Sequence, residues 1–331
     1  KTPDVIYMLG KLQEKRNITL SKKTPILLSS DDDWVKATII GEDGKNQRKV
    51  NVKLRLKGDW TDHIKDSKKL SFRIKVENNG SVFGMSKFSI HDPRTRHGAK
   101  EALSLAMQRL IGVLSPRYFF VDVKVNEQSV GIMALEEHFT KEMAEANNRR
   151  EGSFLRIDED WAWQQRFLNW NKVGAKDWNS ITRQVNWLPS HEEIEKRCKG
   201  TLTHCSYGLG EIDDWRHAGV LWQGASTQSI FVPLKLRDFP VKILNKGKFV
   251  AGAVRSQNAM RGSNLLRDIS EGRIPGRLAF DLDLTSRWWI MAHVWRATHG
   301  IHFTNRKFFF NPITDRLEPV GFDNMPVPQI G

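Results

Sequence analysis

Cysteine is scarce in this sequence, whose 331 residues include only Cys198 and Cys205. Their spacing is neither that of a CxxC pair nor that of zinc ligands, which argues against a disulfide-rich scaffold and a zinc finger. A local disulfide in an oxidising compartment and two unrelated thiols both remain open. No apolar run approaches the roughly 18 residues that a membrane span needs, so we expect no transmembrane segment in this chain.

Familiar catalytic signatures are also missing. The sequence contains no GxxxxGK[ST], GxGxxG, HExxH, GxSxG or EF-hand pattern. This absence argues against the P-loop, dinucleotide-binding, zinc-protease and nucleophile-elbow classes that these patterns mark. The chain also lacks internal repeats and low-complexity linkers, and its length suits one large domain or two lobes.

Positive charge, in contrast, is abundant. Lys and Arg number 52 against 38 Asp and Glu, which gives a formal net charge of +14. Such a charge favours polyanionic partners: nucleotides, nucleic acid, an acidic polymer or an anionic membrane surface. Because no run of five or six basic residues occurs, a generic basic surface is the simpler interpretation and a bound polyanion the alternative.

Alternating apolar and polar residues predict an antiparallel sheet in the first half of the chain. The alternation is clearest over residues 50–56, 70–76, 118–125 and 130–135. In the second of these runs, basic residues share the polar face. With the helix expected between the second and third runs, this order predicts an α+β layer.

Two helices are expected from apolar residues at helical spacing. Leu103, Met107 and Leu110 predict a helix between Gly98 and Gly112. A second helix is predicted by a stripe that packs inward: Leu284, Trp288, Met291, Trp295 and Thr298. The tryptophan-rich segment between them, about residues 158–222, predicts either the core of a loop-rich subdomain or a platform that stacks sugars or bases.

A β-hairpin is predicted near the C-terminus. Two aromatic-rich runs between Lys307 and Phe322 flank a turn cluster at residues 311–315. Such a hairpin places Asn305, before its first strand, beside Asp323, after its second. An amide oxygen and a carboxylate in this position suit a hard cation such as Mg²⁺.

A series of short motifs in a fixed order resembles the CotH (spore-coat protein H) kinase family. The motifs are KGDWTDH, KKLSFRIKV, FGMSKF, AKEALSLAMQRLIG, SPRYFFVDVKVNEQSVGIMALEEHF, GSFLRID and NRKFFFNPITDRLEPVGFDN. The resemblance implies an atypical, secreted-type protein-kinase fold with two lobes. The small lobe, residues 1–135, would hold the antiparallel sheet and one helix. The larger, mainly helical lobe, residues 136–331, would hold the insert and the metal-site hairpin, residues 305–323.

The resemblance also implies a site that binds ATP and Mg²⁺. Lys69, which would share a strand face with Arg73, matches the lysine that binds nucleotide phosphates. Gly58 matches a turn glycine whose backbone approaches the phosphates. Glu136 and Glu137 fall beside the nucleotide, where either would pair with Lys69 or contact the ribose.

The C-terminal hairpin carries the rest of the implied site. Asp323 matches the metal-binding Asp, and Asn305 matches the catalytic-loop Asn. Kinases also carry an Asp about five residues before that Asn, but Gly300 stands there, and no Asp or Glu lies between Asp283 and Asn305. His299 and His302 are the nearby groups able to take a proton near neutral pH, and His302 is the candidate base.

The expected function is ATP- and Mg²⁺-dependent transfer of a phosphoryl group to a hydroxyl, on Ser or Thr of a protein or on another envelope substrate. Two alternatives stay open: a catalytically retired kinase fold that binds nucleotide or polyanion, and a tryptophan-rich carbohydrate or cell-envelope binding protein. We expect an extracytoplasmic location, with a signal or anchor absent from this chain. Because kinases continue with helices after the metal-binding Asp, we also expect a fragment or a trimmed lobe.

Overall fold

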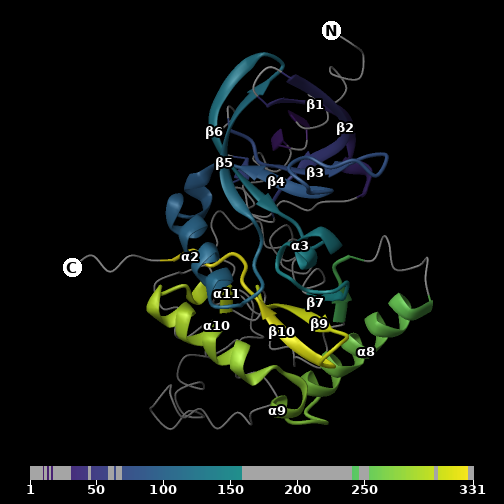
Figure 1. The fold of residues 1–331 in the computed structure, drawn as a ribbon. Helices are drawn as coiled ribbons and strands as arrows, with labels where there is room; N and C mark the ends of the chain where they lie inside the picture. The colour runs from purple at the N-terminus through teal and green to yellow at the C-terminus, as the bar shows by residue number, and fades with distance from the viewer. Residues whose placement is uncertain are drawn as a thin grey trace, which may run out of the picture. The chain divides into compact units, whose positions relative to one another are not determined.

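The structure is a computed structural model that describes two compact units (Figure 1). It describes residues 31–43, 46–58, 63–64, 69–158, 241–245, 253–301 and 305–326, with residues 10, 13–14 and 16–17 near the N-terminus. Unit 1 contains Lys1–Glu151, Arg287–Thr298 and Gly321–Gly331; unit 2 contains Gly152–Ser286 and His299–Val320. Cys198, Cys205, His302 and nearly all of the predicted tryptophan-rich insert lie outside the described residues. The predicted boundary after residue 135 stays a prediction.

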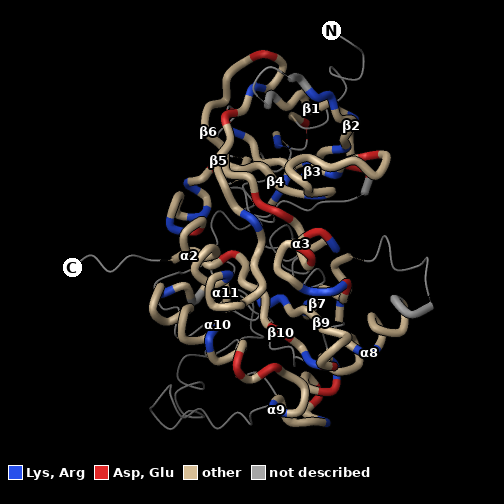
Figure 2. The backbone as a smooth tube through the Cα atoms, viewed as in Figure 1, with Lys and Arg blue, Asp and Glu red and all other residues tan. Residues whose placement is uncertain are grey.

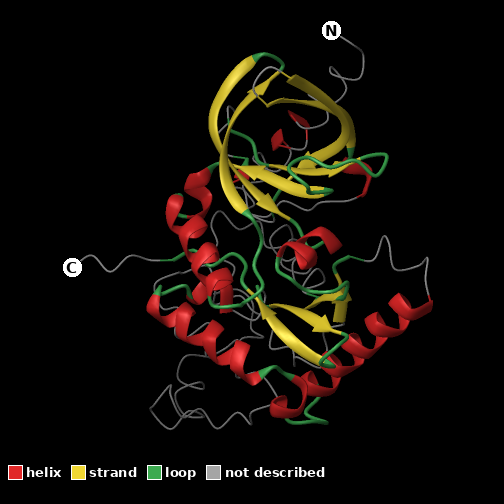
Figure 3. Cartoon of the chain, viewed as in Figure 1, coloured by secondary structure: helices red, strands yellow, loops and turns green. Residues whose placement is uncertain are grey.

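A six-stranded sheet, in the order β1-β2-β3-β4-β6-β5, is the centre of unit 1. All its neighbouring strands are antiparallel, and the sheet curls (Figure 3). The strands are β1 (Val35–Asp43), β2 (Asn46–Leu56), β3 (Phe72–Val76), β4 (Lys87–His91), β5 (Tyr118–Val125) and β6 (Gln128–Glu137). The α+β class expected from the sequence is confirmed.

The two faces of this sheet differ because successive side chains on a strand point to opposite sides. One face forms the core of unit 1, where Val52, Ile74 and Phe88 are almost completely buried. The opposite face carries Lys53 and Arg55 of β2. The candidate functional site described below lies on this polar face.

The helices of unit 1 frame the sheet. They are η1 (Asp31–Asp33), η3 (Pro93–Arg96), α2 (Ala99–Leu110) and α3 (Lys141–Ala146). Asp92 caps η3, since its side chain accepts a hydrogen bond from the backbone N–H of Arg94. The cap and the proline at the first helical position explain why a turn of helix starts directly after β4.

Helix α2 is present where predicted, but the residues that it buries are not those of the apolar repeat from which it was predicted. Leu103 and Leu110 are 52% and 78% exposed. The helix instead buries Glu101, Ser104 and Gln108 together with Leu105. Polar residues are tolerated there because they form hydrogen bonds to the C-terminal segment, as described below.

A four-stranded sheet, in the order β10-β9-β7-β8, is the centre of unit 2. Its strands are β7 (Ser153–Ile157), β8 (Val241–Ile243), β9 (Lys307–Asn311) and β10 (Arg316–Val320). Strands β9 and β10 form the predicted hairpin. Leu155, Phe310 and Leu317 have no exposed surface and form the core.

Helices α8 (Ala253–Ser270) and α9 (Gly276–Ala279) belong to unit 2, whereas α10 (Leu282–Val294) begins in unit 2 and continues into unit 1 from Arg287. A fourth, α11 (Thr298–Ile301), is a single turn. In α10, Leu284 and Trp288 are buried as predicted, whereas Trp295 follows the end of the helix. Among the described residues, no helix combines the length and apolar character that crossing a membrane requires.

Candidate functional site

A buried ion pair joins β2 to β6 on the polar face of the sheet. The Lys57 Nζ donates to the Glu136 Oε2 at 2.7 Å, and the two side chains are only 2% and 3% exposed. Lys57 follows Leu56, which is in the core, so alternation directs the lysine to the polar face. The register aligns Glu136 of β6 with Ser89 of β4 on the same face.

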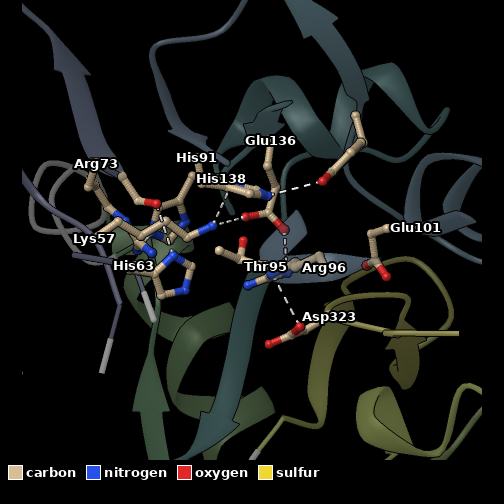
Figure 4. Close-up of polar contacts among 12 residues, drawn as sticks. Lys57, His63, Arg73, His91, Thr95, Arg96, Glu101, Glu136, His138 and Asp323 are labelled. Carbon is tan, nitrogen blue, oxygen red and sulfur yellow. Dashed lines mark hydrogen bonds and ion pairs between the residues drawn. The ribbon is translucent and has the colours of Figure 1, made fainter. Parts of the chain in front are cut away.

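Arg96 extends this pair to the C-terminal segment (Figure 4). Its Nη1 lies 2.6 Å from the Glu136 Oε1, and its Nε lies 3.2 Å from the Asp323 Oδ1. The guanidinium also lies over the ring of Phe322, 4.9 Å from the centroid. We name Lys57, Glu136, Arg96 and Asp323 the charge chain, because each member contacts the next.

Asp323 is held in a strained backbone conformation. Its φ is +51°, in the left-handed region that a non-glycine residue seldom occupies. The next two backbone N–H groups donate to Glu101: the Asn324 N lies 2.9 Å from Oε1, and the Met325 N lies 2.8 Å from Oε2. Glu101 of α2 therefore fixes the segment that carries Asp323.

The remaining polar residues of α2 complete this anchor. The Asn324 Nδ2 donates to the Ser104 Oγ at 3.0 Å and to the Gln108 Oε1 at 3.2 Å. Gly321 packs so closely on Gln108 and Ser115 that a Cβ at this position would collide with the Gln108 side chain. The polar face of α2 thus positions the segment that carries Asp323.

Histidines surround the lysine end of the charge chain. The His91 Nδ1 lies 3.1 Å from the Lys57 Nζ, and the His91 Nε2 lies 3.0 Å from the Tyr118 hydroxyl. An ammonium group can only donate, so Nδ1 accepts and the neutral ring carries its proton on Nε2. Burial, and then the charges of Lys57 and Arg96, hold the pKa of His91 well below its usual value.

Burial also shifts the pKa values of the charged residues themselves. It lowers the pKa of Lys57 to about 8, against the opposing effect of the Glu136 charge. Burial acts to raise the pKa of Glu136, but Arg96 and Lys57 outweigh it, and the pKa lies below its usual value. Burial raises the pKa of Glu101 to about 8, although the charge of Arg96 opposes the rise. Near neutral pH, Lys57 and Glu136 are charged and Glu101 is mostly protonated.

Gly58 has the left-handed φ, +106°, that favours glycine. A Cβ at this position would collide with the His63 ring, which in turn lies 3.0 Å from the Ser71 Oγ through Nδ1. The close approach predicted for this glycine is therefore an approach to His63. Its contact with a phosphate stays a prediction.

Glu136, which pairs with Lys57, was predicted to pair with Lys69 or to contact the ribose. Lys69 lies three residues before β3, and its Nζ donates to the backbone oxygen of Ile132 at 3.2 Å. Arg73 contacts the His138 Nε2. Glu137 points away from Glu136 and pairs with Arg117, at 2.6 Å between the Arg117 Nη2 and the Glu137 Oε1. The roles predicted for these residues in nucleotide binding stay predictions.

Asn305 belongs to unit 2, where its Nδ2 donates to the backbone oxygen of His299 at 3.1 Å. Asp323 belongs to unit 1, so the predicted pairing of these two residues around a cation stays a prediction. Across the described parts of the chain, no three His, Cys, Asp or Glu side chains gather as a metal site.

Sequence reasoning missed Lys57, Arg96 and Glu101 as site residues. A weak signal was available for Lys57, which continues the strand alternation of β2 onto the polar face immediately before Gly58. Arg96 lies in a stretch of mixed charge, HDPRTRH, and Glu101 occupies the first turn of α2, where acids are common for local reasons. Nothing local distinguishes these residues from surface charges.

Comparison with known proteins supplies the remaining observation. No curated protein matches this chain. The CotH kinase protein family matches residues 54–202, a range that includes Lys57, Arg96, Glu101 and Glu136. This match confirms the resemblance that the motifs indicated: the chain is similar to CotH kinases, and a kinase-like function is the class that the similarity supports.

Proposed function

We propose that this protein binds ATP with Mg²⁺ and transfers the terminal phosphoryl group to a hydroxyl, on Ser or Thr of a protein or on another extracytoplasmic substrate. The arrangement of two lobes found in protein kinases is part of the proposal. The observation that carries it is the charge chain, which brings two cations and two carboxylates from distant parts of unit 1 together in a buried position.

Lys57 is the cation best placed to neutralise a phosphate. Its ammonium group is buried and already oriented by Glu136 and His91, which reduces the entropy lost when a ligand binds. Lys69, the lysine indicated by the family resemblance, is the alternative. Phosphoryl transfer depends mainly on positioning and charge stabilisation, and a fixed lysine supplies both.

Asp323 fits a Mg²⁺ ligand. Its side chain is 14% exposed and offers hard carboxylate oxygens, and Mg²⁺ usually binds one or two carboxylates together with substrate phosphates. Asn305 is the second predicted ligand. When bound, the ion would neutralise charge on the phosphates. Arg96 already forms an ion pair with the Asp323 carboxylate. When Mg²⁺ binds, Arg96 would either orient this carboxylate or be displaced from it by the ion.

The hydroxyl acceptor needs a group that orients it or takes its proton. His302 is our candidate, because no Asp or Glu lies between Asp283 and Asn305 and a neutral imidazole can accept a proton near neutral pH. The same absence favours a second candidate function, a nucleotide-binding protein without turnover. His302→Ala separates the two: loss of transfer with binding retained supports the kinase.

Nucleotide binding is the first measurement. We expect calorimetric titration with ATP and Mg²⁺ to show binding that Asp323→Asn and Lys57→Met each weaken at least about tenfold, the effect of losing a charge-assisted contact. Lys69→Met is the matched comparison, and it decides which lysine contacts the phosphates. Circular dichroism checks that each variant is folded. Absence of ATP binding by the folded wild-type protein would rule out both candidate functions.

A further inference from the structure

A row of four lysines crosses the polar face of the sheet in unit 1. Strand register aligns Lys36 of β1 with Lys53 of β2, Lys53 with Lys75 of β3, and Lys75 with Lys87 of β4. Neighbouring strands lie about 4.8 Å apart, so the row extends over about 14 Å. We name these four residues the lysine row. Lys36 and Lys75 are exposed, and the other two are partly exposed.

Two arginines form a second row on the same face. Arg55 of β2 and Arg73 of β3 are register partners, and each is two residues from a member of the lysine row. Figure 2 shows the basic positions recurring along β1, β2 and β3. Like charges directly opposite each other destabilise a sheet, so the alignment of Lys36, Lys53 and Lys75 is not favoured by folding alone. The Lys53 Nζ has a local counter-charge in Glu77, at 3.5 Å from its Oε1.

We infer that the lysine row and the arginines beside it bind an acidic segment of a polypeptide in extended conformation. In such a segment, alternate side chains point to one side at intervals of about 6.8 Å. This interval equals the separation of Lys53 from Arg55 along β2, and of Lys75 from Arg73 along β3. Acidic residues at every second position would therefore meet one cation from each row.

The same face is less suited to single-stranded nucleic acid. Sheets that bind single strands combine basic groups with aromatic rings on which bases stack. Among the described residues, Trp34 contacts the rows, and the Arg55 guanidinium already lies over its ring, 4.9 Å from the centroid. The rows thus offer charge for carboxylates without an open ring at this position for a base.

The inference rests on the proposed function, because it names the class of substrate. Lys57 continues the polar face two residues after Arg55, so an acidic segment bound to the rows lies along the approach to the charge chain. The substrate would be a protein whose target Ser or Thr is flanked by alternating acidic residues. Electrostatic attraction between the rows and this segment would mainly raise the rate of association. The attraction would weaken as the salt concentration increases.

Fluorescence anisotropy of the full chain without nucleotide tests the inference. The probe is a short labelled peptide with glutamate at every second position, compared with the same peptide carrying glutamine. We expect the double variant Lys36→Gln/Lys75→Gln to bind the acidic peptide about fivefold more weakly, as expected for two exposed ion pairs. The matched control, Lys100→Gln/Lys124→Gln, removes the same charge from two exposed lysines elsewhere and should bind like the wild-type protein.

Each other outcome overturns the inference. Equal losses in both double variants would indicate net charge alone, and equal affinity for the two peptides would exclude carboxylate recognition. Tighter binding of an oligothymidine strand, or of vesicles containing anionic lipid, would assign the face to nucleic acid or to a membrane. Peptide binding is measured without ATP. If the protein does not bind the peptide, the proposal that it binds nucleotide is unaffected. If the protein does not bind nucleotide, the peptide result still stands.

Discussion

Arg96 is the counter-ion of the buried Glu136 and of Asp323, whose side chain is 14% exposed. Its side chain is 6% exposed, so water cannot replace it when it is removed. Breaking a buried ion pair by deleting one partner costs about 3–5 kcal/mol, since the other charge stays buried. We expect Arg96→Ala to lower the free energy of unfolding by that amount, measured by urea denaturation.

Arg94 provides the control for this substitution, because it lies in the same helical turn. Its side chain is 73% exposed and pairs with Asp92, and exposed pairs contribute little to stability. Arg94→Ala should therefore shift the urea midpoint much less. Similar shifts in both variants would show that Arg96 is not a buried counter-ion.

Glu101 should make stability decrease as pH rises from about 4.5 to about 8. Burial raises its pKa in the folded state to about 8 from a usual value of 4.5, so the folded protein binds more protons than the unfolded chain between these values. The free energy of unfolding then falls with increasing pH, by at most ~1.4 kcal/mol per pH unit. Below pH 6.5 the buried histidines, whose pKa values are lowered, act in the opposite direction.

The measurement is the melting temperature of the wild-type protein and Glu101→Gln between pH 6.5 and 8. The variant cannot ionise at this position, so its melting temperature should fall less steeply over this range. Parallel curves would mean that Glu101 is already ionised at neutral pH, held by the N–H groups of Asn324 and Met325.

At the residue scale, the predicted site residues Glu136 and Asp323 both lie in the charge chain. The phosphate-binding role predicted for Lys69 stays a prediction, and Lys57, which the sequence did not single out, is the lysine that pairs with Glu136. Lys57 and Glu136 are 79 residues apart, and the spacing along the chain does not reveal such a pair. The lysine is recognised only once strand register is known.

Among the secondary-structure elements, α2 has an unusual distribution of buried residues. Gln108 contacts Asn324 and is 1% exposed, while Leu110, two residues later, is 78% exposed. We expect Gln108→Ala to lower the free energy of unfolding by about 1–3 kcal/mol, because it deprives the buried amide of Asn324 of one of its two hydrogen-bond partners. Leu110→Ala should change it by less than about 0.5 kcal/mol.

Chemical denaturation of both variants checks this contrast. A larger loss for Leu110→Ala would show that the apolar stripe, and not the polar face, stabilises the helix. Leu105, which has no exposed surface, gives a positive control: its replacement by alanine should cost about 2–5 kcal/mol.

The elements themselves were largely predictable. Strands β2, β5 and β6 and the β9–β10 hairpin follow from alternation and turn residues. Strand β3, with five residues, was predicted as well, whereas β4 and β7, which have the same length, were not. The helical repeat located α2 but did not show which face is buried, because hydrogen bonds to residues more than 200 positions away decide that.

On the scale of the whole molecule, unit 1 needs the end of the chain. Residues 321–326 supply Asp323 and the partners of Glu101, Ser104 and Gln108. We expect truncation after Val320 to expose these groups and to increase amide hydrogen exchange in α2. Mass spectrometry of exchanged peptides measures the effect.

A shorter truncation, after Pro326, is the control, because it retains every contact described for this segment. It should leave exchange in α2 unchanged. Unchanged exchange after the longer truncation would show that α2 is held without the C-terminal segment.

Assembly of a unit from three stretches of chain is beyond what local patterns predict. The predicted pairing of Asp323 with Asn305 stays a prediction, because the two residues belong to different compact units. Hairpin pairing is local and was predicted correctly, whereas the contact of residues 321–326 with α2 closes a loop of more than 200 residues. The periodicity of apolar residues along the sequence carries no information about such a long-range contact.

The charge chain balances two cations against two anions, and this neutrality has a thermodynamic consequence for ligand uptake. Because its own four charges cancel, the charge chain by itself gains little by admitting a polyanion alone or a divalent cation alone. The two ligands should therefore enter with positive cooperativity, each compensating the charge of the other. By linkage, the factor by which the cation tightens nucleotide binding must equal the factor by which the nucleotide tightens cation binding.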